Sequence, residues 1–258
     1  MTRRHLTAAL AAMTIGATTG GLGLGGAGAI AAAPKVPANI TAALADKARP
    51  EADVKRDAAR HPGELLAWAG VKSGDKAVDF IMGGGYFTRI LSAAVGPKGH
   101  VWAYQPSEFI KFRAAYGEEQ KTVAGAYANV TPITAPFGEL KLPDGVDLVL
   151  TVQNYHDLHL KPFPADNAAK LNAEIFRALK PGGTYVVVDH VGPAEEGTPD
   201  KLHRIDPAQV KKEVEAAGFK FVGETDLLRA KDDPHTANVF DPSIRGKTDQ
   251  FAMKFRKP

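Results

Sequence analysis

Apolar residues along the chain form two patterns that alternate: short continuous runs, typical of buried strands, and helical spacing. Between short apolar runs, hydrophobic residues recur at helical spacing, as Phe87, Ile90 and Leu91 do. Strands that alternate with helices indicate a parallel sheet covered by helices on both faces. We therefore expect a doubly wound α/β fold. Its first five strands are predicted at 77–81, 101–105, 130–134, 146–152 and 185–189.

The last third of the chain departs from this alternation. Asp206 and Pro207 are typical of a helix start. Two strand patterns come next, at about 219–226 and at 249–256, with no helical pattern between them. Because strands without a crossover pair antiparallel, we expect a large hairpin at the sheet edge. The connection at 227–248 is long for a compact domain, and such loops are often lids or binding loops.

The N-terminus differs in composition from the rest. Arg3 and Arg4 precede a weakly apolar stretch rich in Ala, Gly and Thr, which ends in small residues before Pro34. A membrane anchor needs about 20 strongly apolar residues, so this pattern favours a cleaved signal peptide, and the arginine pair resembles a twin-arginine signal. We expect a periplasmic or secreted protein without a stable membrane anchor after cleavage. The expected segments are a leader, a helical extension and one domain at 1–33, 34–62 and 63–258.

Composition excludes several classes of protein. The chain has 258 residues, 44% of them hydrophobic and 24% charged, and it has no cysteine. These proportions are those of a globular protein rather than of a disordered chain or a disulfide scaffold. Lys and Arg number 32 against 29 for Asp and Glu, so charge gives no indication of a nucleic-acid partner. The oligomeric state stays open.

A glycine triplet follows the first predicted strand and precedes a helix. Asp79 lies near the strand end, Gly83 and Gly85 follow four and six positions later, and Ile81 stands between them. Glycines allow a tight turn and close approach of a ligand to the backbone, and the helix N-terminus offers unpaired N–H groups. The second predicted strand ends at Gln105.

In this order the motifs resemble those of the class I S-adenosylmethionine-dependent methyltransferases, over roughly residues 63–258. The family's first motif has a glycine where Ile81 stands, and its second has an acid where Gln105 stands. The segments 145–150, 179–183 and 185–189 are similar to later motifs. The resemblance implies a Rossmann-like sheet in the order 3-2-1-4-5-7-6, with strand 7 antiparallel, and an enzyme with S-adenosylmethionine as cofactor.

The resemblance also implies a set of cofactor-binding residues. We expect a β-branched residue such as Ile81 not to take the positive φ that glycine often supplies, so that the turn begins at Gly83. Gln105 would bind the ribose less strongly than an acid, by about 1 kcal/mol. The expected cofactor contacts are Asp79, Gly83, Gly84, Gly85, Tyr86, Gln105 and Asn154.

Four histidines should meet at one rim of the sheet, because they follow strands that the family's strand order makes neighbours. They are His156, His159, His190 and His203. His156 with Asp157, or His190, is the candidate general base, and the expected catalytic residues are these three. Two alternatives are a polar loop histidine and a metal site built on His156, His159, His190 and nearby acids. We assign no metal ligands.

The candidate substrate contacts are His203 itself and two residues next to these histidines, Tyr155 and Arg204. Arg204 could hold an anionic substrate or form an ion pair, and His235 would join the rim if the loop at 227–248 folds over it. Segments 153–157, 189–190 and 202–206 resemble a group of predicted exported bacterial methyltransferases. The expected function is methyl transfer to an O or N nucleophile of a small-molecule or envelope acceptor. The alternative is a methyltransferase fold with changed chemistry: a metal- or histidine-dependent hydrolase or lyase, or a noncatalytic binding protein.

Overall fold

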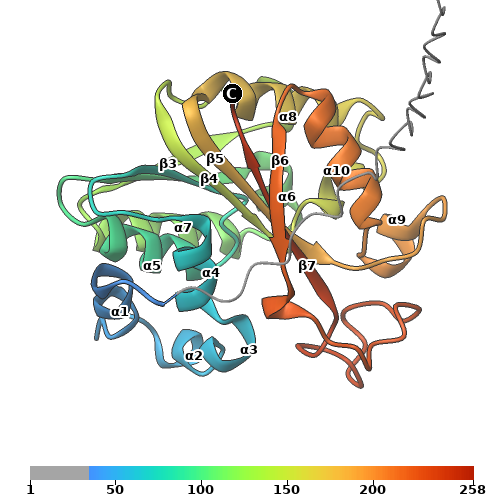
Figure 1. The fold of residues 1–258 in the computed structure, drawn as a ribbon, viewed down its shortest axis with the longest axis horizontal. Helices are drawn as coiled ribbons and strands as arrows, with labels where there is room; N and C mark the ends of the chain where they lie inside the picture. The colour runs from blue at the N-terminus through green and yellow to red at the C-terminus, as the bar shows by residue number, and fades with distance from the viewer. Residues whose placement is uncertain (1–34) are drawn as a thin grey trace, which may run out of the picture.

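A computed structural model describes residues 35–258 (Figure 1). The leader predicted at 1–33 lies outside the described residues. Within 35–258, no helix has both the length and the apolar character needed to cross a membrane.

In the described part of the chain, seven strands form one sheet in the order β3-β2-β1-β4-β5-β7-β6. The first five strands pair in parallel, and β7 runs antiparallel to both of its neighbours. This confirms the predicted fold, including the terminal hairpin. The strands are β1 Lys76–Phe80, β2 His100–Pro106, β3 Val130–Ala135, β4 Val146–Val152, β5 Leu179–His190, β6 Lys220–Thr225 and β7 Gln250–Arg256.

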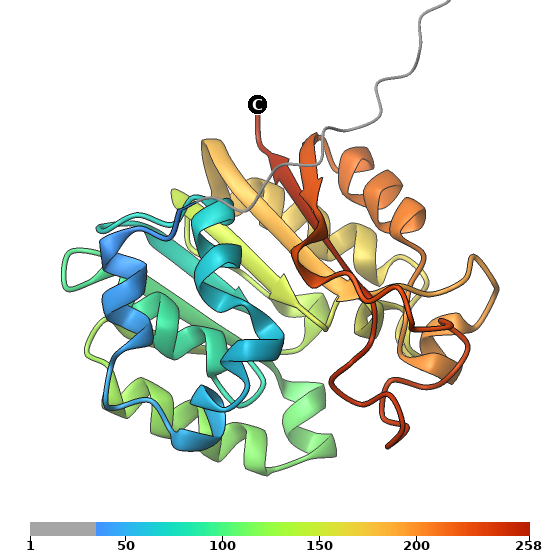
Figure 2. The same cartoon turned by 60° about the horizontal axis from the view of Figure 1, so that its bottom comes forward.

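Helices cover both faces of the sheet (Figures 1 and 2). The helices α1 Ala38–Leu44, α4 Pro62–Ala69, α5 Tyr86–Val95 and α7 Ala115–Ala126 pack on one face. The helices α8 Asn167–Ala178 and α10 Pro207–Ala216 pack on the other. The remaining short helices are α2 Glu51–Val54, α3 Asp57–Arg60, α6 Ser107–Phe112 and α9 Thr198–Leu202, with 3-10 turns η1 Phe137–Glu139, η2 His156–His159 and η3 Asp226–Leu228.

The alternation of side chains along each strand separates two apolar cores. In β5, Val186 and Val188 belong to the core under α5, whereas Tyr185 and Val187 belong to the core under α8 and α10. Successive strand residues point to opposite faces, so a strand buried on both sides is apolar throughout. This explains the continuous apolar runs in the sequence.

Two helix ends test the local sequence signals. The carboxylate of Asp206 accepts a hydrogen bond from the Ala208 N–H at 2.9 Å, which confirms the predicted start of α10. The glycines in the segment 179–183 do not cap α8, although a Pro-Gly-Gly run is typical of a helix end, because α8 ends at Ala178 and Leu179 is already extended. The left-handed residue is Gly182, with φ of 76°, in the bend where β5 leaves its first pairing with β4. Gly182 therefore forms this bend near the start of β5 and does not cap α8.

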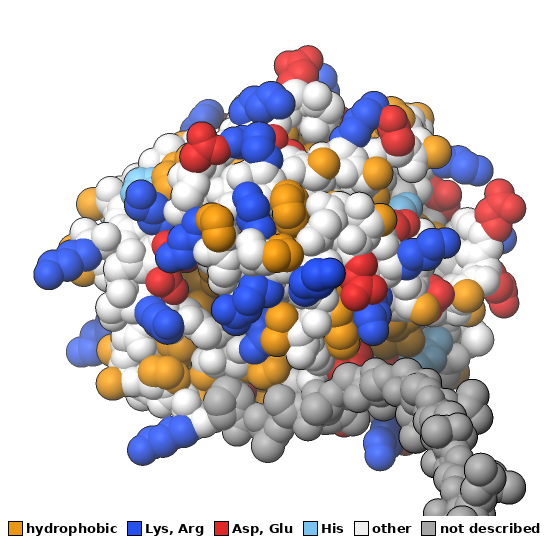
Figure 3. All heavy atoms as spheres, turned by 45° about the horizontal axis from the view of Figure 1, so that its top comes forward, with side chains coloured by type: hydrophobic (Ala, Val, Ile, Leu, Met, Phe, Trp, Pro, Cys, Tyr) orange, Lys and Arg blue, Asp and Glu red, His pale blue; other side chains and the backbone are white. Residues whose placement is uncertain are grey.

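The surface face shown in Figure 3 carries basic and acidic side chains among one another, with hydrophobic side chains between them. This distribution fits the near balance of 32 basic and 29 acidic residues.

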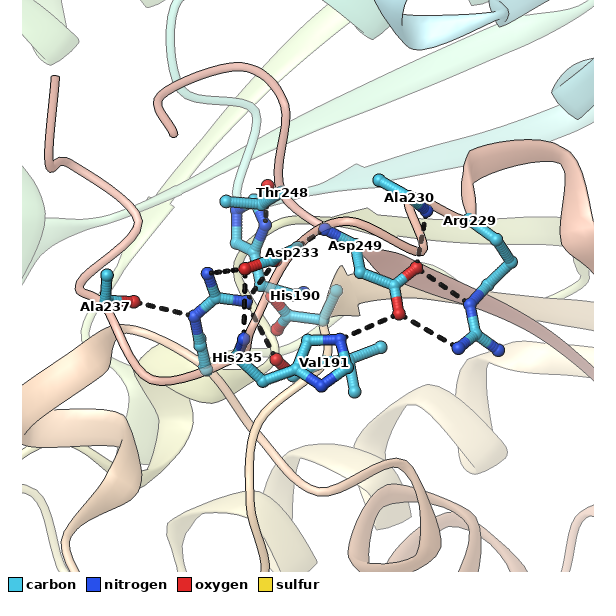
Figure 4. Close-up of polar contacts among 11 residues, drawn as sticks. His190, Val191, Arg229, Ala230, Asp233, His235, Ala237, Thr248 and Asp249 are labelled. Atoms are coloured by element: carbon cyan, nitrogen blue, oxygen red, sulfur yellow. Dashed lines mark hydrogen bonds and ion pairs between the residues drawn. The ribbon is translucent and has the colours of Figure 1, made fainter. Parts of the chain in front are cut away.

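The long connection between β6 and β7 is fixed by a buried ion pair (Figure 4). Arg204 is fully buried, and its guanidinium donates to both carboxylate oxygens of Asp233 at 2.7 and 3.0 Å. It also donates to the backbone oxygens of Val191 and Ala237, each at 2.9 Å. The prediction that Arg204 contacts substrate is therefore wrong, because its charge is used to hold this loop.

A second carboxylate continues the network. Asp249 accepts from Arg229 at 2.8 and 2.9 Å and from the Ala230 N–H at 2.7 Å, and its Oδ2 lies 2.9 Å from His235 Nε2. The Asp249 N–H in turn donates to Asp233 at 2.7 Å. The loop does fold over the rim of the sheet, but His235 faces Asp249 and does not line the cavity there.

Removing the charge of Arg204 should unfold this loop and destabilise the protein. In Arg204→Met, the buried carboxylate of Asp233 loses its partner, so we expect the free energy of unfolding to fall by about 3–5 kcal/mol. Urea denaturation measures this change. The control is Lys121→Met, which breaks an exposed pair with Glu118 and should change stability by about 0.5 kcal/mol or less. A loss in Arg204→Met no larger than in the control would contradict this account of the loop.

Candidate active site

A cavity of about 1400 Å³ lies at the carboxyl ends of the parallel strands. In Figure 2, the N-terminal helices and the C-terminal loop lie on either side of these strand ends. The volume of the cavity exceeds that of a pocket for one drug-sized ligand, about 300–1,000 Å³, so the cavity has room for a cofactor and a second molecule. The cavity is lined by the N-terminal extension, the glycine loop, α6 with the start of α7, a cluster of histidines, and the loop before β7.

Asp79 is the buried carboxylate at the glycine-loop end. It lines the cavity with 4% of its surface exposed, and its Oδ2 accepts a hydrogen bond from the Thr88 hydroxyl at 2.6 Å. Burial raises the pKa of Asp79 to about 6, although the Thr88 hydrogen bond and the charge of Arg60 oppose the shift. The group is therefore an ionised carboxylate at neutral pH, held at an energetic cost.

The glycine loop turns earlier than the sequence indicates. Ile81 has φ of 63°, and Gly83 and Gly85 follow with φ of 53° and 80°. The expectation that Ile81 avoids positive φ is wrong. Such a conformation costs on the order of 1–3 kcal/mol. The Ile81 side chain is 3% exposed and lies in the same apolar cluster as Phe80 and Tyr104, and this burial offsets the cost.

The side chain of Gln105 holds the glycine loop by a hydrogen bond. It is fully buried, and its Oε1 accepts a hydrogen bond from the Gly83 N–H at 2.9 Å. Gln105 does not line the cavity, so the structure does not bear out its expected contact with the ribose. Glu108, in the next turn of chain, does line the cavity and accepts a hydrogen bond from the Phe137 N–H at 3.1 Å. Glu108 is thus the acid nearest in sequence to position 105, where the family has an acid and this chain has Gln105.

The N-terminal extension packs directly on the glycine loop. Tyr86 donates its hydroxyl to Asp57 at 2.6 Å, and Asp57 also pairs with Arg49. Arg60 of α3 lies over the Tyr86 ring, 4.6 Å from its centroid, and donates to the side-chain oxygen of Gln153. Burial lowers the pKa of Arg60 to about 10, so it stays cationic beside Asp79. Arg60 was not among the predicted site residues, because no sequence motif marks it.

His156 is held at the other end of the cavity by the carboxylate of Asp189, the residue before the last of β5. Its Nδ1 lies 2.9 Å from Asp189 Oδ1, and its backbone N–H donates to Asp189 Oδ2 at 2.7 Å. Its Nε2 lies 3.3 Å from Asp157 Oδ1. Burial alone would lower the pKa of His156, but the two carboxylates outweigh it and raise the pKa to about 9. Asp189 lies in a predicted motif segment, but its role at this site was not predicted.

His190 and His203 join His156 as expected, and all three line the cavity. The ring centroids of His190 and His203 lie 6.2 and 5.4 Å from that of His156. Burial lowers the pKa of His190 to about 4, so this ring is neutral at pH 7. The pKa of Asp157 is raised, mainly by burial. His156 is therefore protonated at neutral pH and His190 is not, so the two candidate bases differ in charge.

Three neighbouring predictions have different outcomes. Asn154 lines the cavity, and its amide donates to Asp157 Oδ2 at 3.0 Å. Tyr155 is fully buried and donates its hydroxyl to Glu213 at 2.9 Å, so the expected substrate contact is wrong. His159 also turns to Glu213, at 3.1 Å, away from the other histidines. An i, i+3 spacing on a 3-10 turn did not bring His156 and His159 together.

Comparisons with known proteins agree with this geometry. Residues 78–187 match the family described as "Methyltransferase domain". No match was found among curated proteins.

Solved structures of the same fold include several methyltransferases. A SAM-dependent methyltransferase from Aquifex aeolicus is 21% identical, with a TM-score of 0.54, over 76% of this chain and 89% of that one. Phosphoethanolamine N-methyltransferase 2 from Haemonchus contortus, in complex with S-adenosyl-L-methionine, is 17% identical with a TM-score of 0.52, over 77% of this chain and 52% of that one. The [4+2]-cyclase SpnF is 17% identical with a TM-score of 0.54, over 82% of this chain and 85% of that one.

At these identities the likeness concerns the fold, which is the class I methyltransferase fold. The family match adds a methyltransferase domain that includes the glycine loop and most of β5. Together the match and the fold indicate a methyltransferase domain.

The charge of Asp79 should lower stability above its pKa. The folded protein holds the Asp79 proton more tightly than the unfolded chain, because the pKa is about 6 when folded against an ordinary 3.8. Stability contributed by this group is therefore lost as pH rises from about 4 to 6. Asp79→Asn keeps an acceptor for Thr88 without a charge, so we expect it to raise the free energy of unfolding at pH 8 by about 1–3 kcal/mol, and by less at pH 4.5.

Urea denaturation at both pH values measures this gain. Thr88→Val is the matched control, because it removes the hydrogen bond and leaves the charge, and it should lower stability at pH 8. An Asp79→Asn protein that is less stable than the wild type at pH 8 would show that the carboxylate serves the fold.

Proposed function

We propose that this protein transfers a methyl group from S-adenosylmethionine to an O or N nucleophile of a small-molecule or envelope acceptor. The observation that carries the proposal is the continuity of the cavity, which runs from Asp79 and the glycine loop to His156, Asp157 and His190. One end suits the donor and the other suits an acceptor that must lose a proton.

The donor's amino-acid end matches the charges beside the glycine loop. S-adenosylmethionine carries an ammonium and a carboxylate on the same carbon. Asp79 and Arg60 line the cavity together and carry the opposite charges. Hydrogen bonds to charged groups contribute about 1.5–3 kcal/mol each, so this pair would supply much of the cofactor's affinity.

The protein does not have to activate the methyl donor, because the sulfonium methyl is already electrophilic. The site has to align donor and acceptor, exclude water and receive a proton. His190 is neutral and Asp157 offers a carboxylate, whereas His156 already holds a proton between two carboxylates. In this arrangement His156 orients Asp157, and His190 or Asp157 receives the proton. His203 completes this end as a substrate contact.

The cofactor site can be tested by thermal unfolding of the full chain. Ligand at about one hundred times its dissociation constant adds about 2.7 kcal/mol, which should raise the midpoint by roughly 5–10 °C with S-adenosylmethionine or S-adenosylhomocysteine. Arg60→Met should weaken the affinity by about 10- to 100-fold through the lost charged hydrogen bond. Lys55→Met, an exposed residue on the same extension, should leave it unchanged.

No shift at millimolar ligand in a folded protein would overturn the proposal. A changed chemistry on the same fold would then be favoured; SpnF, which shares the fold, is named as a [4+2]-cyclase rather than as a methyltransferase. The burial of Gln105 beneath the loop, where the family has a ribose-binding acid, is the observation that favours this second candidate.

We propose further that the protein acts in the periplasm or outside the cell, as one of the group of exported methyltransferases that its motifs resemble. The Arg3-Arg4 leader supports export of the folded protein, which could carry one bound cofactor with it. Continued turnover would need cofactor outside the cytoplasm. No nucleic acid or membrane is needed as a partner for this function.

Export through the arginine pair has its own test. Substituting both Arg3 and Arg4 by Lys keeps the charge of the leader, yet it should leave the protein unprocessed in the cytoplasm, as cell fractionation and N-terminal sequencing would show. The wild-type protein should be found outside the cytoplasm with its N-terminus close to Pro34. An unchanged distribution of the variant would argue against twin-arginine export.

A further inference from the structure

We propose that His156, Asp157 and His203 bind a divalent transition-metal ion at the acceptor end of the cavity. One ligand atom from each residue lies within 4.8 Å of the others, and all three side chains line the cavity. The sequence pattern led us to assign no metal ligands, and the alternative set that it raised was His156, His159, His190 and nearby acids. The fold puts His203 in the place that His159 was expected to take.

The distances are close to those that a small ion requires. His156 Nε2 lies 3.3 Å from Asp157 Oδ1, and His203 Nδ1 lies 4.0 Å from the same oxygen. Ligands placed about 2.0–2.2 Å from a tetrahedral ion are about 3.4 Å apart. The first distance already fits, and the second requires a shift of about 0.6 Å. The His203 side chain is 27% exposed, and no hydrogen bond to its ring is found within residues 35–258, so it can make this move.

Both inner ligands are oriented by an outer partner. Asp189 binds His156 through Nδ1 at 2.9 Å, which leaves Nε2 directed at Asp157. Asn154 donates to Asp157 Oδ2 at 3.0 Å, which leaves Oδ1 directed at the two histidines. Histidines that bind metals commonly have the second ring nitrogen on a carboxylate, which fixes the tautomer and the ring orientation. His156 Nε2, Asp157 Oδ1 and His203 Nδ1 therefore face one point, and binding of an ion there releases the proton from His156 Nε2.

The ligand types select the ion. Two imidazoles and one carboxylate suit Zn²⁺, Co²⁺ and their neighbours, whereas Mg²⁺ and Ca²⁺ prefer oxygen ligands alone. Three protein ligands leave at least one position open toward the cavity. An ion there could bind an acceptor hydroxyl and lower its pKa, which favours loss of its proton before methyl transfer. This role rests on the proposed function, whereas binding of the ion does not.

Metal titration of the full chain tests the site directly. The chelator-treated protein is titrated with Co²⁺, read by the visible absorption of the bound ion, and with Zn²⁺ in equilibrium dialysis. We expect one ion per chain at this site, no competition from Mg²⁺, and a loss of affinity of about 100-fold or more in His203→Ala and in Asp157→Asn, since even outer-partner changes cost about 10- to 100-fold.

The matched control is His159→Ala, because His159 lies on the same turn but is bound to Glu213. It should keep wild-type metal affinity. His203→Ala should keep the cofactor-induced thermal shift, which shows that it folds, and Asp79→Asn should keep metal binding. The two proposals therefore fail separately. Absence of a bound Co²⁺ or Zn²⁺ ion in the wild type, or an equal loss in His159→Ala and His203→Ala, would overturn the metal site.

Discussion

The site depends on the buried carboxylate of Asp189. Asp189 is the residue before the last of β5 and has none of its surface exposed, and an ionised group in such a place must be fully hydrogen-bonded. It accepts the backbone N–H of His190 at 2.7 Å, and both the backbone N–H and the ring of His156. These bonds, with the charge of His156, hold the pKa of Asp189 below its usual value despite burial. One carboxylate thereby ties the end of β5 to the turn after β4.

Two segments outside the sheet complete the cavity. The N-terminal extension brings Arg60 to the glycine loop, and the loop before β7 brings Phe240 and Thr248 to the histidine end. Each segment is held by an ion pair: Arg49 with Asp57, and Arg204 with Asp233. The strand edge alone would leave both ends of the site open, so the cavity requires these surface additions to be ordered.

The sequence was sufficient for the sheet and for the convergence of three histidines. Apolar runs located the strands because strands buried on both faces are apolar throughout, and parallel strands bring the loops after them to one edge. The wrong predictions and the site residue that was not predicted have a common origin. Arg204 resembles a solvent-facing cation until Asp233, far along the chain, is placed beside it. Ile81 takes a left-handed turn because burial offsets its strain, and Arg60 gains its position through packing on Tyr86. Each depends on tertiary contacts that no local pattern encodes.

Hydrogen–deuterium exchange of the full chain, with and without S-adenosylhomocysteine, tests the central claim that the cofactor occupies this cavity. The account predicts slower exchange in the glycine loop at 81–86 and in the extension around Arg60, which line the same end of the cavity. It predicts no change in β6, at the far edge of the sheet. Bound ligand with unchanged exchange at 81–86 would contradict the account.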